Sequence, residues 1–180
     1  MRYIKFLLVT VFLITIQSCS KDEEDGHFIP TDLFVRIDST KNINEVFNFI
    51  NSYNHEVEYI TMQAFTSSLP SDSLNNALNY LNERPYIDQN IWPVYGFPYE
   101  DNFKILPRLF EMDNKKFQKD WKDTMQKLKL KEFYNEKSLN GRVIFFHVPA
   151  GKEKYWAKKF QKLDFVVWTE LNYTGETYID

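Results

Sequence analysis

Hydrophobic residues in this chain switch repeatedly between the two-residue period of a strand and the three-to-four-residue period of an amphipathic helix, which restricts the folds open to it. In the first helical stretch the apolar residues recur on one face, at Ile43, Val46, Phe47 and Ile50. The elements expected in this part are a strand at 33–37, a helix capped by Asn42, strands at 57–63 and 64–69, a helix starting at Pro70 and a strand at 86–94. Their order, β-α-β-β-α-β, is the ferredoxin-like arrangement.

The residues after position 100 repeat this order. They comprise an expected strand at 103–110 interrupted by Pro107, a helix capped by Asp113, strands at 130–134 and 142–148, a helix beginning at Gly151 and a closing strand at 164–172. The interruption by Pro107 predicts an edge strand, and the Asn-Gly pair at 140–141 predicts a hairpin that joins the strands beside it. We therefore expect an α+β fold of two tandem ferredoxin-like units, residues 32–99 and 100–180. The alternative is one larger α+β domain, because blocks this small often share a sheet or a core.

Four short segments together resemble the propeptides of subtilisin-type proteases. They are the strand Phe34–Ile37, the run Ala64–Pro70, the leucine-spaced helix at 74–81 and the closing stretch Val166–Tyr173. The resemblance implies a protein that lays its sheet on a protease and runs its C-terminal tail, residues 173–180, through the substrate cleft. Tyr173 and Tyr178 would then contact the partner. A polar terminus without any role is the alternative.

The N-terminus has the pattern of an export signal. Arg2 and Lys5 precede an apolar run at 6–16, which is shorter than the roughly 20 residues that span a bilayer. Ser18 stands directly before Cys19, the only cysteine in the chain. This arrangement resembles the lipobox of bacterial lipoproteins, which implies that residues 1–18 are removed and that Cys19 carries a diacylglycerol. An ordinary signal peptide with an incidental cysteine is the alternative.

An acidic tether, residues 19–31, begins at the cysteine. The residues directly after Cys19 are Ser20, Lys21, Asp22, Glu23, Glu24 and Asp25. They resemble the signal that sends lipoproteins of the Bacteroidetes to the outer face of the outer membrane, whereas a plain solvated spacer is the alternative. We expect a lipid-anchored, surface-exposed outer-membrane protein.

The composition argues against several kinds of function. Lys and Arg number 22 against 25 Asp and Glu, and nucleic-acid binding needs a basic surface. The three histidines, His27, His55 and His147, lack partners at metal-binding spacing, and the chain contains no Gly-x-Ser-x-Gly motif. An enzyme would require a cleft in which His55 or His147 meets carboxylates. We expect no catalytic activity, no cofactor and no metal.

Aromatic residues supply the candidate binding site. The segment 86–99 gathers rings beside Pro93, Gly96 and Pro98, and exposed rings dominate the binding energy of many interfaces. The candidates are Trp92, Tyr95, Phe97 and Tyr99, together with Tyr173 and Tyr178. The alternative is that these rings seal the core between the two blocks. We expect a protein-binding module whose sharpest form is an inhibitor of a subtilisin-type protease; a structural or immunity-type lipoprotein with one cognate protein is the alternative.

Overall fold

The computed structural model describes residues 27–61, 64–133 and 142–174. The signal segment, Cys19, the tether up to residue 26, the loop at 135–141 and Tyr178 lie outside these described residues. The elements form a mixed fold with two antiparallel sheets, which confirms the α+β part of the expected fold. Across the described ranges, no helix is long and apolar enough to cross a membrane.

One sheet has five strands in the order β6-β2-β8-β1-β9. Its strands are β1 (Phe28–Ile37), β2 (Glu56–Thr61), β6 (Leu109–Phe110), β8 (Arg142–His147) and β9 (Val166–Tyr173). The helices α2 (Ile43–Tyr53) and α5 (Glu153–Phe160) cover one of its faces. There the Phe49 ring of α2 lies 5.8 Å from Phe146 of β8 and 5.3 Å from Phe160 of α5. This aromatic contact holds both helices on the sheet.

The second sheet has four strands in the order β4-β5-β3-β7. Its strands are β3 (Ala64–Ser67), β4 (Tyr95–Tyr99), β5 (Asn102–Leu106) and β7 (Leu130–Phe133), and its helices are α3 (Leu74–Asn82), preceded by the 3₁₀ turn η1 (Ser71–Ser73), and α4 (Lys115–Lys127). Trp121 of α4 is fully buried, with its ring 5.2 Å from Phe65 of β3. Gly96 of β4 lies in line with Phe65 across the sheet and faces Leu74 and Leu78 of α3, so both helices pack on one face.

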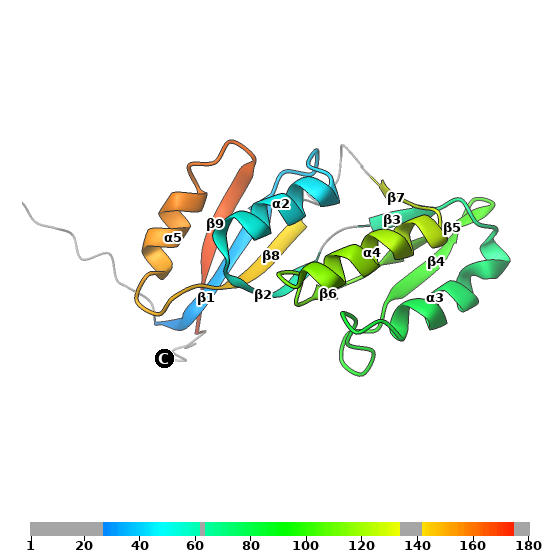
Figure 1. Cartoon of the computed structure of the whole chain (residues 1–180), viewed down its shortest axis with the longest axis horizontal. Helices are drawn as coiled ribbons and strands as arrows, with labels where there is room; N and C mark the ends of the chain where they lie inside the picture. The colour runs from blue at the N-terminus through cyan, green and yellow to red at the C-terminus, as the bar shows by residue number, and fades with distance from the viewer. Residues whose placement is uncertain (1–26, 62–63, 134–141, 175–180) are drawn as a thin grey trace, which may run out of the picture.

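Each sheet contains strands from both sides of residue 100. β1 and β2 pair with β8 and β9, whereas β3 and β4 pair with β5 and β7. Figure 1 shows the consequence, because the five-stranded sheet contains both the blue and the red ends of the described chain and the four-stranded sheet runs from teal through green to yellow. The sheets do not follow the expected division into 32–99 and 100–180. The order of elements along the chain is compatible both with sheets confined to one half of the chain and with sheets that combine the two halves. Only contacts between distant residues decide between these arrangements.

The strands around the loop at 135–141 do not pair with each other, which corrects the expected hairpin. β7 pairs with β3 in one sheet, and β8 pairs with β1 and β2 in the other. The stretch at 103–110 is likewise divided at Pro107 between β5, an inner strand of the four-stranded sheet, and β6, an edge of the five-stranded sheet. The predicted edge position is therefore correct only for β6.

Residues 86–94 form turns, not the expected strand. The Asp88 carboxylate accepts hydrogen bonds from the backbone N–H groups of Asn90 and Ile91, at 3.0 and 3.1 Å, and its carbonyl accepts from Trp92 N–H at 2.8 Å. These local bonds fold the backbone into a turn in place of a strand ladder. The strand begins only at Tyr95.

Side-chain caps set the starts of two helices. Asn42 caps α2 in a capping box with Glu45, as expected. Asn114, not Asp113, caps α4 by accepting from the backbone N–H of Lys116 at 3.0 Å. The Asp113 carboxylate instead accepts from the Val57 N–H at 3.2 Å and so links the start of α4 to β2.

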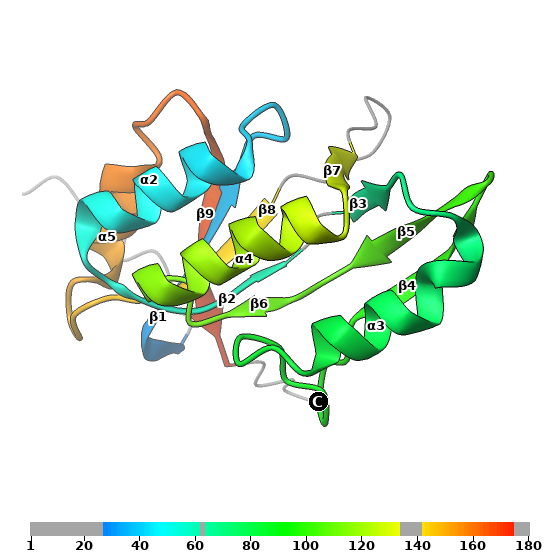
Figure 2. The same cartoon turned by 45° about the vertical axis from the view of Figure 1, so that its right-hand side comes forward.

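The helices of the two sheets are joined. α2 and α4 lie side by side in both views (Figures 1 and 2), and the amides of Asn51 and Gln118 exchange two hydrogen bonds of 3.0 and 3.1 Å between them. Most of the buried apolar residues of both sheets belong to one cluster. The shared core agrees with the alternative of a single larger α+β domain.

Candidate functional site

Aromatic residues gather on the side of the four-stranded sheet that faces away from α3 and α4. We call this surface the aromatic face; it consists of Tyr95, Phe97, Tyr99, Lys104, Leu106 and Phe133. Residues two apart on a strand share a side, Phe97 is paired with Lys104, and Phe133 is paired with Ala64. Tyr95, Phe97 and Leu106 are 65%, 36% and 42% exposed. An exposed apolar surface of this kind is typical of an interaction site.

Gly96 allows the strand that carries these rings to lie close to α3. A Cβ atom at this position would lie 3.0 Å from a Leu74 methyl carbon, 3.1 Å from a Leu78 methyl carbon and 3.1 Å from the Lys104 carbonyl oxygen. Since Gly96 faces the helix, its neighbours Tyr95 and Phe97 face away from it. The glycine thus fixes which side of β4 is aromatic.

Lys104 lies at the centre of the aromatic face and is only 8% exposed. Its ammonium nitrogen is 3.3 Å from the ring centroid of Tyr99 and 3.4 Å from that of Phe133. Cation–π attraction to both rings stabilises the charge there. Among the described residues, none forms a hydrogen bond or an ion pair with this ammonium group.

A groove of about 310 Å³ continues from the aromatic face toward the five-stranded sheet. Its lining is Thr61, Trp92, Pro93, Tyr95, Leu106, Pro107 and Arg108. Arg108 lies where the chain crosses from β5 to β6, with its guanidinium carbon 3.7 Å from the ring centroid of Trp92 and 4.4 Å from that of Tyr59. Within the described ranges the guanidinium has ring contacts but no hydrogen-bonded or ionic partner. Its N–H donors therefore remain available to a ligand.

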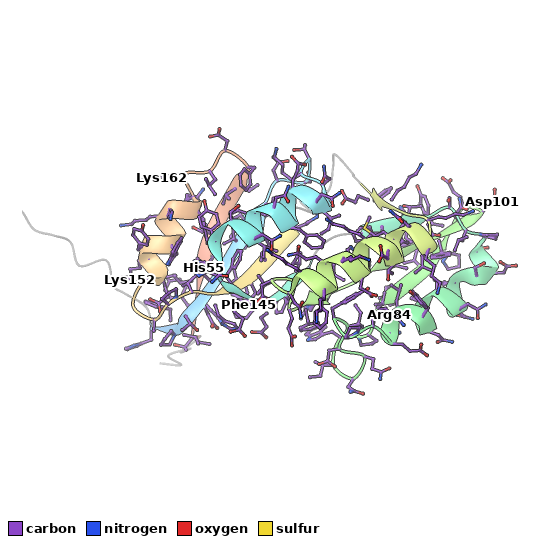
Figure 3. All side chains as sticks on the ribbon, in the orientation of Figure 1. His55, Arg84, Asp101, Phe145, Lys152 and Lys162 are labelled. Atoms are coloured by element: carbon purple, nitrogen blue, oxygen red, sulfur yellow. The ribbon has the colours of Figure 1, made fainter. Side chains whose placement is uncertain are left out.

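The side of the five-stranded sheet opposite α2 and α5 carries a polar cluster around His147. Nδ1 of His147 lies 3.2 Å from an Asp32 carboxylate oxygen on β1, and Nε2 lies 3.0 Å from a Glu58 oxygen on β2. Asn172 of β9 also donates to Asp32, at 2.8 Å. Phe145, labelled in Figure 3, precedes the histidine on the same side of β8, with ring centroids 5.1 Å apart.

The cluster joins four strands, and its geometry suits a cross-link. Both ring nitrogens of His147 are directed to carboxylates, so an imidazolium donates to both and a neutral ring donates to only one. Both nitrogens are thus directed toward carboxylates of neighbouring strands. No group of three His, Cys, Asp or Glu in the described parts of the chain could hold a metal ion.

His55 follows α2 and lies on the side of the sheet that the helices cover, with its ring centroid 6.3 Å from that of Phe146. It is buried, with its ring centroid 4.3 Å from that of Trp156 on α5. Burial lowers the pKa of His55 below its usual value, and the nearby charge of Lys159 lowers it further. The histidine therefore belongs to the packing between α2 and α5.

The four candidate rings at 92–99 are brought together. Tyr95 and Phe97 have ring centroids 6.1 Å apart, Tyr99 contacts Lys104, and Trp92 contacts Arg108 in the groove. Tyr173 lies elsewhere, at the end of β9, where its ring is 6.3 Å from that of Phe28 and is 52% exposed.

Sequence reasoning missed Lys104, Arg108 and the partners of His147. Alternation along β5 places Lys104 and Leu106 on one side, but the rings that contact the two cations come from β2, β4, β7 and the turn at 86–94. Only the sheet register reveals these contacts. Searches against protein-family models, curated proteins and solved structures gave no match.

Proposed function

We propose that the chain is a lipid-anchored protein of the bacterial outer membrane that binds a protein partner through the aromatic face and the adjoining groove. The observation that carries this proposal is the exposure of Tyr95, Phe97 and Leu106 beside Trp92, which is itself 48% exposed. Contact between large exposed rings and water is unfavourable in free energy. A partner that covers the rings removes this contact and so gains binding free energy. The proposal assigns no catalytic activity and no cofactor.

The anchor rests on the sequence pattern before and after Cys19. Two acyl chains give stable attachment where one gives only marginal binding. Cys19→Ser should release the protein from the membrane fraction of cells. Persistent membrane association of the variant would contradict the lipid anchor.

We further propose that the fold consists of two ferredoxin-like units, one inserted into the other. The outer unit would be β1-α2-β2-β8-α5-β9 and the inserted one β3-α3-β4-β5-α4-β7. In support, the sheet orders β2-β8-β1-β9 and β4-β5-β3-β7 are the same when the strands of each unit are numbered in sequence. β6 would then be an extra edge strand of the outer unit.

The most specific version of this proposal is that the chain inhibits a subtilisin-type protease. The segments that resemble such propeptides lie in different sheets. Phe34–Ile37 and β9 belong to the five-stranded sheet, whereas the stretch at 64–70 begins with a strand of the four-stranded sheet. Incubation of the chain from residue 19, carrying Cys19→Ser, with several subtilases should slow their hydrolysis of a chromogenic peptide. Digestion of the chain without loss of protease activity would contradict this form.

A pull-down from envelope extracts tests the binding function. The wild-type chain should retain a partner that Tyr95→Ser loses. Tyr155→Ser is the matched control, because Tyr155 is 58% exposed against 65% for Tyr95 and lies on α5. Equal retention by all three chains would contradict binding at the aromatic face. A retained protein that is not a protease would favour a structural or immunity-type lipoprotein.

A further inference from the structure

We propose that the aromatic face and the groove bind an extended acidic segment of the partner, with one carboxylate at Lys104 and another at Arg108. This inference rests on the proposed protein-binding function and specifies the chemistry of the partner. It starts from two cations that contact aromatic rings and, within the described chain, have no anionic partner.

The environment of Lys104 favours a carboxylate supplied from outside. The residue is more than nine-tenths buried, and two rings within 3.4 Å of its ammonium nitrogen only partly replace the water it has lost. Thr66, its partner across the sheet, has a buried hydroxyl oxygen with no hydrogen-bond partner among the described residues. An incoming carboxylate could accept a hydrogen bond from the ammonium group, whereas the Thr66 hydroxyl oxygen is closed to solvent in this structure.

Arg108 presents a complementary site at the other end. A guanidinium is a planar fork of N–H donors that matches the two oxygens of a carboxylate. Contacts with Trp92 and Tyr59 restrict its orientation, so less conformational entropy is lost when an anion binds. Charge complementarity therefore selects an acidic occupant for the groove.

The spacing of the two cations fits one extended peptide. Lys104 and Leu106 lie on one side of β5, and Arg108 follows two residues beyond the end of that strand, so the Cα atoms of the two cationic residues are at most about 14 Å apart. In an extended ligand, side chains i, i+2 and i+4 lie on one side, and residues i and i+4 are about 13 Å apart. Acidic residues at i and i+4 would meet the two cations, and an apolar residue at i+2 would meet Leu106 and Tyr95.

The direct test is a titration of the ¹⁵N-labelled chain from residue 19, carrying Cys19→Ser, followed by NMR. The probe is the peptide acetyl-Glu-Thr-Val-Thr-Glu-amide, and its control has Gln in place of both Glu residues. A uridine oligonucleotide is a third ligand. We expect the acidic peptide to shift the amide signals of β4 and β5 and to bind at least tenfold more tightly than the Gln peptide.

Variants of the two cations identify the binding site. Arg108→Gln and Lys104→Met should each weaken binding of the acidic peptide at least fivefold, whereas Lys119→Met on the exposed side of α4 should leave it unchanged. Arg108 is partly exposed, so Arg108→Gln remains informative if the buried Lys104 variant fails to fold.

Three results would overturn the inference: equal binding of the two peptides, binding of the oligonucleotide alone, or no shifts at millimolar peptide. If one of these occurs while Tyr95→Ser still loses the envelope partner, the acidic ligand is wrong and the proposed function stands. Retention of the partner by Tyr95→Ser would instead refute the proposed function itself.

Discussion

Arg142 of β8 and Glu132 of β7 form a buried ion pair, 3.0 Å apart, that joins the five-stranded sheet to the four-stranded one. Their side chains are 3% and 9% exposed. Glu132 also accepts from the backbone N–H of Ile43 at 2.6 Å, and Arg142 donates to the carbonyl of Lys41. The pair thus fixes the start of α2 between both sheets.

Removal of the Glu132 carboxylate should destabilise the whole fold. Glu132→Ala leaves the Arg142 charge buried without this partner, which typically costs about 3–5 kcal/mol. Urea unfolding should show a lower midpoint. Asp123→Ala removes an exposed ion pair with Lys119 and should leave the midpoint unchanged. Equal midpoints for the two variants would show that the buried pair contributes little.

His55 should make the fold less stable as the pH is lowered. Its folded-state pKa lies below the unfolded value of about 6.5, so the neutral form stabilises the fold above that pH and the stabilisation is lost as the pH falls through the folded-state pKa. The free energy of unfolding should decrease between pH 7.5 and pH 5, and it should decrease less in His55→Asn. An identical pH profile in the variant would contradict the assignment.

Gly96→Ala should destabilise the sheet that carries the aromatic face. The added methyl group meets two leucine side chains, which can move, and the Lys104 carbonyl, which is held in the sheet. Overpacking of this kind costs about 1–3 kcal/mol, seen as a lower melting temperature. Leu74→Ala in the same chain should recover part of the loss. Unchanged melting of the single variant would show that β4 and α3 are not closely packed.

The sequence predicts the type of most elements because each carries a local signal. Asn42 and the spacing of Ile43, Val46 and Phe47 predict α2 correctly. The alternation at 33–37 predicts only the second half of β1, because the strand begins at Phe28, inside the expected tether, where Phe28 pairs with Tyr173. Two local predictions fail where side-chain hydrogen bonds decide the outcome. Asp88 folds 86–94 into turns, and Asn114 takes the cap expected of Asp113.

Strand partners could not be predicted, because pairing depends on contacts between residues far apart in the chain. β1 lies between β8 and β9, more than 100 residues away, and the cluster of Asp32, Glu58 and His147 exists only in that register. The rings at 92–99 are predicted from their clustering in one segment of the sequence. Their cationic neighbours Lys104 and Arg108 can be identified only from the folded structure.

Photo-crosslinking tests the central claim, that the aromatic face binds a protein partner. A benzoylphenylalanine residue replaces Phe97 on that face in one chain and Tyr155 on α5 in another, and both chains are irradiated in envelope preparations. We predict a crosslinked protein at position 97 and none at position 155. Crosslinking at 155 but not at 97, or at neither position, would contradict the claim.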